Sequence, residues 1–246
     1  MTGTINLYIS SKFTPGSSYR PGQVRRSLEK DLQDFKRDHI DIYWLHLPFD
    51  IEKNLGEIIG LFREGKIRNI GVSNFNMEEC MEAKRILDDA GIPLYGIQNH
   101  YSLVNRKWEK DGLVRWCHDN NILFWAWAVL EEGMLTDPRV RTKMSAMKLI
   151  FHRKKKKLLP LYRLMNKVGK HHNISIPQVA MAFCSSKGII PICGCRRSYQ
   201  VEQLNEAVNI LLTKKEIKLL EDEADRIGVK ILGADMFRFA VKKKRG

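Results

Sequence analysis

The chain has 246 residues, with 42 Lys and Arg against 28 Asp and Glu, which gives a formal net charge of +14. The excess is local: residues 139–172 hold twelve basic residues and no acid, and residues 238–246 hold five more, so the remainder is slightly acidic. This distribution argues against nucleic-acid binding over the whole surface. Hydrophobic residues make up 43% of the chain, enough for a large core, which excludes disorder over most of its length.

The sequence carries no signal for export or for a membrane. No apolar run approaches the roughly 18 residues that cross a bilayer, and the N-terminus lacks a basic segment followed by an apolar one. The five cysteines are an odd number in helical or strand-like contexts, which is typical of reduced thiols. We therefore expect a cytoplasmic protein without a membrane span.

Short apolar runs alternate with segments of helical periodicity along the chain. The runs predict six strands, at residues 6–10, 40–45, 67–72, 95–98, 122–127 and 188–192. Helices are predicted at residues 21–37, 55–64, 77–90, 108–120, within 139–187, and at 198–208. The run at 40–45 is apolar almost throughout, like strands buried on both faces of a parallel sheet. This alternation predicts an α/β fold, either a doubly wound open sheet or a (β/α) barrel.

Local chemistry marks several helix ends. Capping-box spacing occurs in Asn76 with Glu79 and in Thr213 with Glu216, while Ser175 followed by Pro177 suits a first turn. Glycines that suit the residue after a helix are Gly65, Gly91, Gly188 and Gly228.

Polar residues gather where successive predicted strands end. They are Lys12, His46, Ser73, Asn74, Gln98, Asn99 and residues 194–197. Barrel enzymes place their chemistry at the carboxyl ends of their strands. The open-sheet alternative lacks its phosphate-binding fingerprint, because no G-x-G-x-x-G follows a strand and no P-loop occurs. The pattern therefore favours the barrel.

Each of these residues also has an ordinary interpretation. Lys12 can be a solvated strand end, and His46 a core histidine with satisfied hydrogen bonds. Ser73 and Asn74 can form a turn before a helix, and Trp127 can be part of the core. The order and spacing of these residues carry more weight than any one of them.

Six segments in order resemble the aldo/keto reductase family over most of the chain. They are ISSK at 9–12, LEKDL at 28–32, IDIYWLHLP at 40–48, GKIRNIGVSNF at 65–75, QNHYSL at 98–103 and IPICGCRR at 190–197, with Gln200 beyond. The resemblance implies a (β/α)8 TIM barrel enzyme that transfers hydride from a nicotinamide cofactor to a small carbonyl substrate. Here it implies one partial barrel domain over residues 1–246, with about six βα units.

The resemblance assigns catalytic roles to two residues. Lys12 matches the family's active-site lysine and His46 its active-site histidine. Carbonyl reduction needs a proton donor near the developing alkoxide, and a nearby ammonium lowers a phenol's pKa toward neutrality. His46 is expected to orient the substrate carbonyl through a hydrogen bond.

The resemblance also assigns the cofactor site. Ser73, Asn74 and Gln98 match the residues that bind the nicotinamide carboxamide, and Trp127 takes the position of an aromatic, usually tyrosine, that stacks on the ring. Gly194, Arg196, Arg197 and Gln200 match the loop and helix start that hold the adenosine phosphate. The paired arginines favour NADPH over NADH.

The chain also departs from the family pattern. Family members have about two further βα units before the lysine, and those units supply a catalytic aspartate and a proton-donating tyrosine. Residues 127–130 read WAVL instead of tyrosine-serine-proline-leucine, and Leu204 replaces an asparagine. We expect an N-terminally truncated member with impaired activity. There are two alternatives: the chain has degenerated to a non-catalytic cofactor-binding or structural protein, or a partner chain completes the barrel.

A different class of function rests on the basic insertion at 139–172, placed by the resemblance between strands seven and eight. Its run at 153–157 could bind nucleic acid, anionic lipid or an acidic protein, and the basic tail at 238–246 carries the rest of the local charge excess. A solvated face beside the cofactor's phosphates is the favoured interpretation, so nucleic acid is not expected as a partner. No metal site is expected either, because Cys193-x-Cys195 has no second ligand pair, and His171-His172 is not placed by sequence to complete it.

Overall fold

The computed structural model describes residues 7–16, 18–136 and 156–229. These residues form two compact units. Unit 1 contains residues up to 99 together with 113–123, and unit 2 contains 100–112 and the described residues from 124 onward. Six strands alternate with helices in the described chain, and the fold is a parallel α/β architecture.

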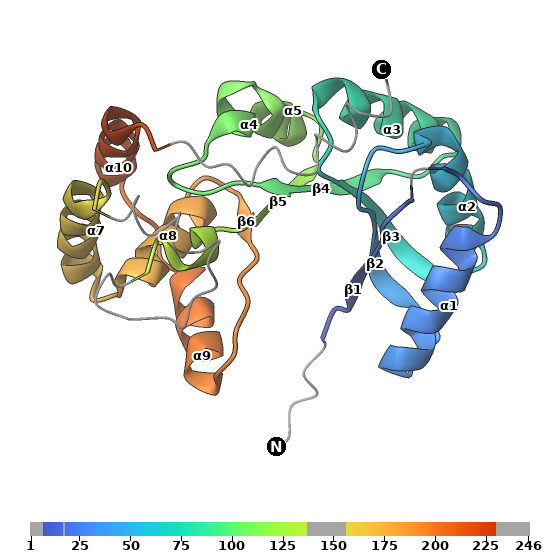
Figure 1. Cartoon of the computed structure of the whole chain (residues 1–246), viewed down its shortest axis with the longest axis horizontal. Coiled ribbons are helices and arrows are strands. Elements are labelled where there is room, and N and C mark those ends of the chain that lie inside the picture. Colours follow the sequence, from blue (N-terminus) through green and yellow to red (C-terminus); the bar gives the residue numbers. More distant parts are fainter. Residues whose placement is uncertain (1–6, 17, 137–155, 230–246) are drawn as a thin grey trace. The chain divides into compact units, whose positions relative to one another are not determined.

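Unit 1 is built on parallel strands in the sheet order β1-β2-β3-β4 (Figure 1). The strands are β1 (Ser10–Phe13), β2 (Ile40–Leu45), β3 (Ile67–Ser73) and β4 (Leu94–His100), whose last residue belongs to unit 2. Its helices are α1 (Gln23–Phe35), α2 (Ile51–Arg63), α3 (Met77–Asp89) and α5 (Leu113–Asp119). Helix α2 packs between α1 and α3.

Strand β2 lies at the centre of the unit 1 core. All six of its residues are buried, and Tyr43 and Trp44 are fully so. Trp44 Nε1 donates to Ser10 Oγ at 2.7 Å. The indole ring occupies space that only a glycine at position 71 leaves open, because a Cβ there would lie 2.3 Å from Trp44. The continuous apolar run at 40–45 thus forms a parallel strand buried on both faces.

Unit 2 carries the remaining elements of the described chain. Strands β5 (Leu123–Trp127), whose first residue belongs to unit 1, and β6 (Ile190–Pro191) pair in parallel. The helical elements are α4 (Lys107–Lys110), the 3-10 turn η1 (Glu131–Gly133), α7 (Leu159–His172), α8 (Ile176–Ser185), α9 (Ser198–Ala207) and α10 (Lys214–Ile227). Helix α8 packs against both α7 and α9, and α10 packs against α7.

The predicted helix ends agree well with the structure. Asn76 and Thr213 each accept a hydrogen bond from the backbone N–H three residues on, as capping boxes require. Four predicted glycines, Gly65, Gly91, Gly188 and Gly228, adopt positive φ. Gln178 completes the start of α8, because its Oε1 accepts from the Ser175 backbone at 3.0 Å.

Other boundaries differ from the prediction. The first strand is Ser10–Phe13, later than the predicted 6–10, and α2 begins at Ile51 instead of residue 55. The predicted helix at 108–120 is two helices, because Gly112 turns the chain at φ 83°. The segment at 139–187 contains α7 and α8, separated at Asn173 with φ 56°. Residues 139–155 and the tail at 238–246 lie outside the described residues.

The sequence predicted no membrane span, and in the described part no helix is both long and apolar enough to cross a membrane. The assignment of residues 1–246 to one partial barrel domain stays a prediction.

Candidate active site

Lys12 lies on β1 and reaches β4. Its ammonium Nζ donates to Gln98 Oε1 at 2.7 Å, although the two residues are 86 positions apart. The side chain is partly open to solvent, but the groups around the ammonium desolvate it and lower the pKa of Lys12 below its ordinary value. Two predicted site residues, one catalytic and one cofactor-binding, are therefore in direct contact.

His46 directly follows β2. Its Nδ1 shares a hydrogen bond of 2.8 Å with Thr14 Oγ1, and its backbone N–H donates to the Phe13 carbonyl. Burial is the main reason that the pKa of His46 falls to about 4, and the positive charge of Lys12 adds to the effect. The imidazole is thus neutral at pH 7, with one nitrogen that donates and one that accepts.

Ser73, Asn74 and Gln98 meet where β3 and β4 end. Ser73 is the register partner of Gln98, and the Asn74 backbone N–H donates to the Gln98 carbonyl at 3.1 Å. Asn74 has φ 62°, a left-handed conformation that asparagine tolerates better than most residues. Its Nδ2 donates to Ser73 Oγ at 3.1 Å and to the His46 carbonyl at 3.0 Å. Hydrogen bonds therefore join the five predicted residues of unit 1 into one cluster. These residues are Lys12, His46, Ser73, Asn74 and Gln98.

Unit 2 contains a cavity of about 980 Å³. Four of the five predicted unit 2 residues line it: Trp127, Gly194, Arg196 and Gln200. The loop after β5 and the residues around Cys193 complete its wall. Arg197 is not among the lining residues and stands immediately before α9.

Gln200 organises the start of α9. Its Oε1 accepts from the backbone N–H of Arg196 at 2.7 Å and of Arg197 at 3.1 Å. The side chain thereby fixes the loop that carries both arginines. The sequence resemblance placed Gln200 in the site but did not indicate this contact with the backbone.

Sequence reasoning missed two buried residues beside Trp127. The His100 ring stacks on Trp127 with 4.4 Å between ring centroids. His100 Nε2 lies 2.9 Å from Glu131 Oε1, and Ser102 Oγ donates to the same oxygen. Both His100 and Glu131 are 3% exposed. His100 stands inside the QNHYSL motif, but its partner lies 31 positions later and no spacing rule connects the two.

The loop that carries Glu131 is conformationally unusual. Ala128, Glu131 and Glu132 have φ values of 59°, 45° and 52°, in the left-handed region that costs a non-glycine residue free energy. Such conformations persist where surrounding contacts hold them, and the His100–Glu131 pair is one such contact. The loop lies directly after Trp127 and lines the cavity.

A sequence profile described as "Aldo/keto reductase family" matches residues 4–225. The chain belongs to the aldo/keto reductase family. Family membership supports an oxidoreductase, and aldo/keto reductases act on small carbonyl compounds. The (β/α)8 fold class, here with six described strands, is confirmed by similarity to solved aldo/keto reductase structures, one of which is described below.

Three aldo/keto reductase relatives illustrate the match. The chain is 28% identical over 85% of its length to "Aldo-keto reductase yakc [NADP(+)]" of Schizosaccharomyces pombe, and covers 65% of that protein. It is 27% identical over 84% of its length to "NADH-specific methylglyoxal reductase" of Escherichia coli, and covers 66% of it. A glycerol dehydrogenase structure from Gluconobacter oxydans superposes with a TM-score of 0.75 at 26% identity, over 88% of this chain and 67% of that one.

The chain spans 57 to 66% of the length of the first three curated relatives. The names of two of them specify different nicotinamide cofactors, NADP(+) and NADH. The residue roles and the choice between these cofactors therefore remain predictions for this chain. Arg153, Lys154 and Lys155 of the alternative basic site lie outside the described residues.

Proposed function

We propose that this chain binds NADPH and that its site serves the reduction of small aldehydes or ketones to alcohols. The observation that carries the proposal is the hydrogen bond of 2.7 Å between Lys12 Nζ and Gln98 Oε1. It joins the lysine assigned to catalysis with the glutamine assigned to the carboxamide. His46 belongs to the same hydrogen-bonded cluster through the amide of Asn74.

Each unit by itself offers groups that fit a part of a dinucleotide. Ser73, Asn74 and Gln98 offer a hydroxyl and two amides, groups that can pair with a carboxamide. Trp127 offers an aromatic face, and its cavity of about 980 Å³ is of the size that holds organic ligands. Gly194, Arg196, Arg197 and Gln200 would hold the adenosine phosphate, with the two guanidinium groups favouring the additional phosphate of NADPH. When bound, the nicotinamide supplies the hydride.

The chain's own residues prepare the carbonyl. A neutral His46 can donate a hydrogen bond to the carbonyl oxygen and so orient it. The Lys12 ammonium places positive charge where an alkoxide develops, and such preorganised charge stabilises the transition state.

The proton donor is the incomplete part of this chemistry. Two tyrosines of unit 1 are engaged elsewhere, because Tyr19 Oη donates to Glu57 and Tyr43 Oη to Ser27. We propose that the 246-residue chain alone binds cofactor but turns over slowly. A further segment or a partner chain that completes the barrel would supply the family's aspartate and tyrosine.

Titration with NADPH, followed by tryptophan fluorescence, tests the cofactor part. We expect saturable quenching in the wild type and weaker NADPH binding in Arg196→Ala and Arg197→Ala, with little change in NADH affinity. Arg63→Ala is the matched control, because it removes an exposed arginine at the end of α2, outside the proposed site. Absence of a saturable response to either dinucleotide would overturn the proposal.

Turnover of a reactive dicarbonyl tests the catalytic part. We expect slow NADPH oxidation that falls by roughly 100-fold or more in Lys12→Met, because the charge acts in the transition state. Lys30→Met, which removes an exposed lysine paired with Asp34, should retain the wild-type rate. Equal rates in wild type and Lys12→Met would contradict the assigned role.

A further inference from the structure

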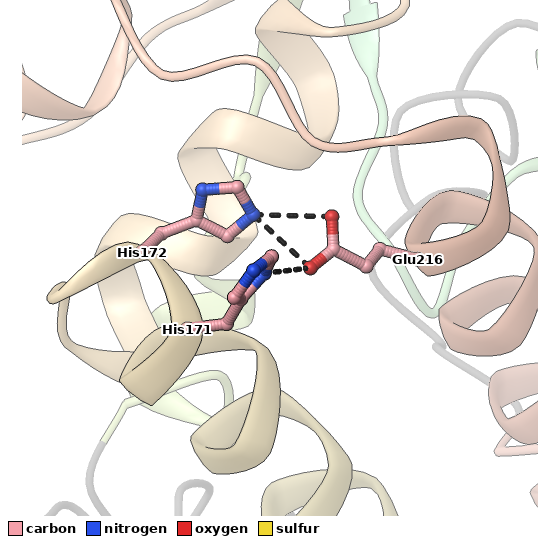
Figure 2. A group of neighbouring side chains, drawn as sticks. All are labelled: His171, His172 and Glu216. Carbon is pink, nitrogen blue, oxygen red and sulfur yellow. Dashed lines mark hydrogen bonds and ion pairs between the residues drawn. The ribbon is translucent and has the colours of Figure 1, made fainter.

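A second cluster of chemically active side chains lies in unit 2, between the end of α7 and the start of α10. His171 and His172 are the last two residues of α7, and Glu216 lies in the first turn of α10. His171 Nδ1 is 2.9 Å from Glu216 Oε1, and His172 Nε2 is 3.1 Å from each carboxylate oxygen. Figure 2 shows both imidazole rings directed at the carboxylate.

The carboxylate of Glu216 is fixed in place by its own helix. Its Oε2 accepts from the backbone N–H and the hydroxyl of Thr213, both at 2.8 Å, in the capping box that starts α10. Burial opposes ionisation of Glu216, but the Thr213 N–H and both histidines outweigh it and lower the pKa of the carboxyl group to about 2. Oε1 has no role in the capping box and faces the two histidines.

The histidines differ in accessibility. The His172 side chain is 18% exposed and that of Glu216 is 13% exposed, whereas His171 is 70% exposed. Two ligands are thus held against the protein, and the third can adjust its rotamer from the solvent side. The cluster is therefore open to solvent on the His171 side.

The geometry points to a metal site: we propose that His171, His172 and Glu216 bind one Zn²⁺ ion. Two imidazole nitrogens and one carboxylate oxygen are standard zinc ligands. Ligand atoms on tetrahedral zinc lie about 3.3 Å apart, given bonds of roughly 2.0 Å. The Glu216 oxygen is already that close to both nitrogens, and all three ligand atoms lie within 4.8 Å of one another.

Zinc binding would replace the present hydrogen bonds with coordination bonds. Each imidazole must present a lone pair, so binding releases any proton that the coordinating nitrogen carries, and affinity falls as the pH is lowered. The three protein ligands leave a fourth position for water. The ion would connect α7 to α10. The histidines and Glu216 are about 44 residues apart, so no sequence motif of short spacing could predict the cluster.

Zinc titration of the full chain against a chromophoric chelator tests the proposal. We expect one ion per chain and at least about a tenfold loss of affinity in His171→Ala and in His172→Ala, as expected for removal of a ligand. His118→Ala is the matched control, since the His118 side chain is exposed, its Nδ1 lies 3.6 Å from Asp119, and it stands outside the cluster. This control should bind zinc as the wild type does.

The thiols near the cavity are the competing ligands. A Cys193→Ser/Cys195→Ser variant should retain the site, and Zn²⁺ should raise the melting temperature of this variant but not of His172→Ala. Circular dichroism of the histidine variants checks that α7 and α10 still form. Loss of binding with the cysteines, unchanged affinity in both histidine variants, or absence of saturable binding would each overturn the proposal.

Discussion

The contact between Lys12 and Gln98 has consequences for His46. The ammonium that donates to Gln98 also contributes to keeping the His46 imidazole neutral, through the repulsion between two cations. A neutral imidazole can donate from one nitrogen while it accepts at the other. Lys12 thus supplies positive charge to the site and reinforces the effect of burial on the protonation state of its neighbour.

The depressed pKa of His46 predicts how stability depends on pH. The folded imidazole titrates near pH 4 and the unfolded one near 6.5, so between these values the unfolded chain binds more protons. Stability contributed by the neutral group is present above pH 6.5 and is lost as the pH falls toward 4. We expect a loss of about 1–2 kcal/mol, reduced because the ring is partly exposed.

Urea unfolding at pH 7 and pH 4.5 measures this loss. The comparison variant is His46→Gln, which has no titrating group at this position. Wild type should lose more stability than the variant over this interval. An equal loss in both proteins would show that His46 does not contribute.

The buried pair beside Trp127 gives a second prediction at the residue level. Glu131→Ala leaves the His100 ring without its carboxylate partner, and His100 Nδ1 already has no hydrogen-bond partner among the described residues. We expect a loss of about 2–3 kcal/mol in the free energy of unfolding, the cost of leaving a buried polar group unsatisfied. Glu132→Ala is a matched control, because Glu132 is exposed and also has positive φ. Similar melting temperatures for the two variants would contradict the prediction.

The residues of the site were only partly predictable from sequence. Lys12, His46, Ser73, Asn74 and Gln98 were predicted because each lies at the end of a strand or follows one and matches the family pattern. The structure brings them together because parallel strands have their carboxyl ends at one edge. His100 and Glu131 were missed because their contact joins distant positions. The contact of Gln200 with the backbone was missed because the sequence does not show whether a glutamine side chain at the start of a helix binds the backbone before it, a ligand or solvent.

At the level of elements, helix starts were easier to predict than helix interruptions. A capping box needs two residues three apart, so Thr213 with Glu216 is visible in the sequence. The break between α4 and α5 depends on the backbone at Gly112, and a glycine within a helical pattern does not show whether it interrupts the helix. The first strand was placed too early because apolar residues precede it, whereas pairing with β2 starts at Ser10.

Strand β3 offers a test of packing inside the sheet. In Gly71→Ala the new methyl group would lie 2.3 Å from the Trp44 ring and 3.0 Å from the Gly96 carbonyl oxygen. We expect a destabilisation of about 2–3 kcal/mol from this overpacking. Thermal unfolding of the purified variant measures it.

A glycine in helix α2 serves as a control for Gly71→Ala, because its replacement by alanine should stabilise the protein. Gly56 is exposed, and a Cβ there meets nothing within 4 Å. Gly56→Ala should therefore raise stability by about 0.5–1 kcal/mol, because alanine restricts the unfolded chain and favours a helix. If Gly71→Ala is more stable than the wild type, or as stable as Gly56→Ala, then the Trp44 ring does not prevent a larger side chain at position 71.

At the scale of the whole molecule, the alternation of strands and helices predicted an α/β fold, and the resemblance to the family supplied the proposed chemistry. The chain covers less than two thirds of its first curated relatives, so the activity of the full-length family members is a proposal for this chain. The sequence could show the order of the βα units because hydrophobic periodicity is local. It could not show the division into two compact units, which depends on contacts between distant segments.

The uneven distribution of basic residues along the chain is also a property of the whole molecule. Replacing the basic residues at 153–157 with glutamine should change the Kd for NADPH by less than about threefold at physiological salt, because salt screens solvated charges that do not contact the ligand directly. Fluorescence titration measures this value. A much larger loss of NADPH affinity would place these lysines in the cofactor site, and a selective loss of RNA or vesicle binding would favour the alternative basic-site function.

The start of α9 determines what an incoming anion has to displace. The amide oxygen of Gln200 already accepts from two backbone N–H groups. A phosphate that used these donors would exchange one acceptor for another, so a small free anion gains little there. If this loop holds the adenosine phosphate as proposed, a ligand with additional anchoring points elsewhere would compete with the Gln200 amide better than free phosphate or sulfate does.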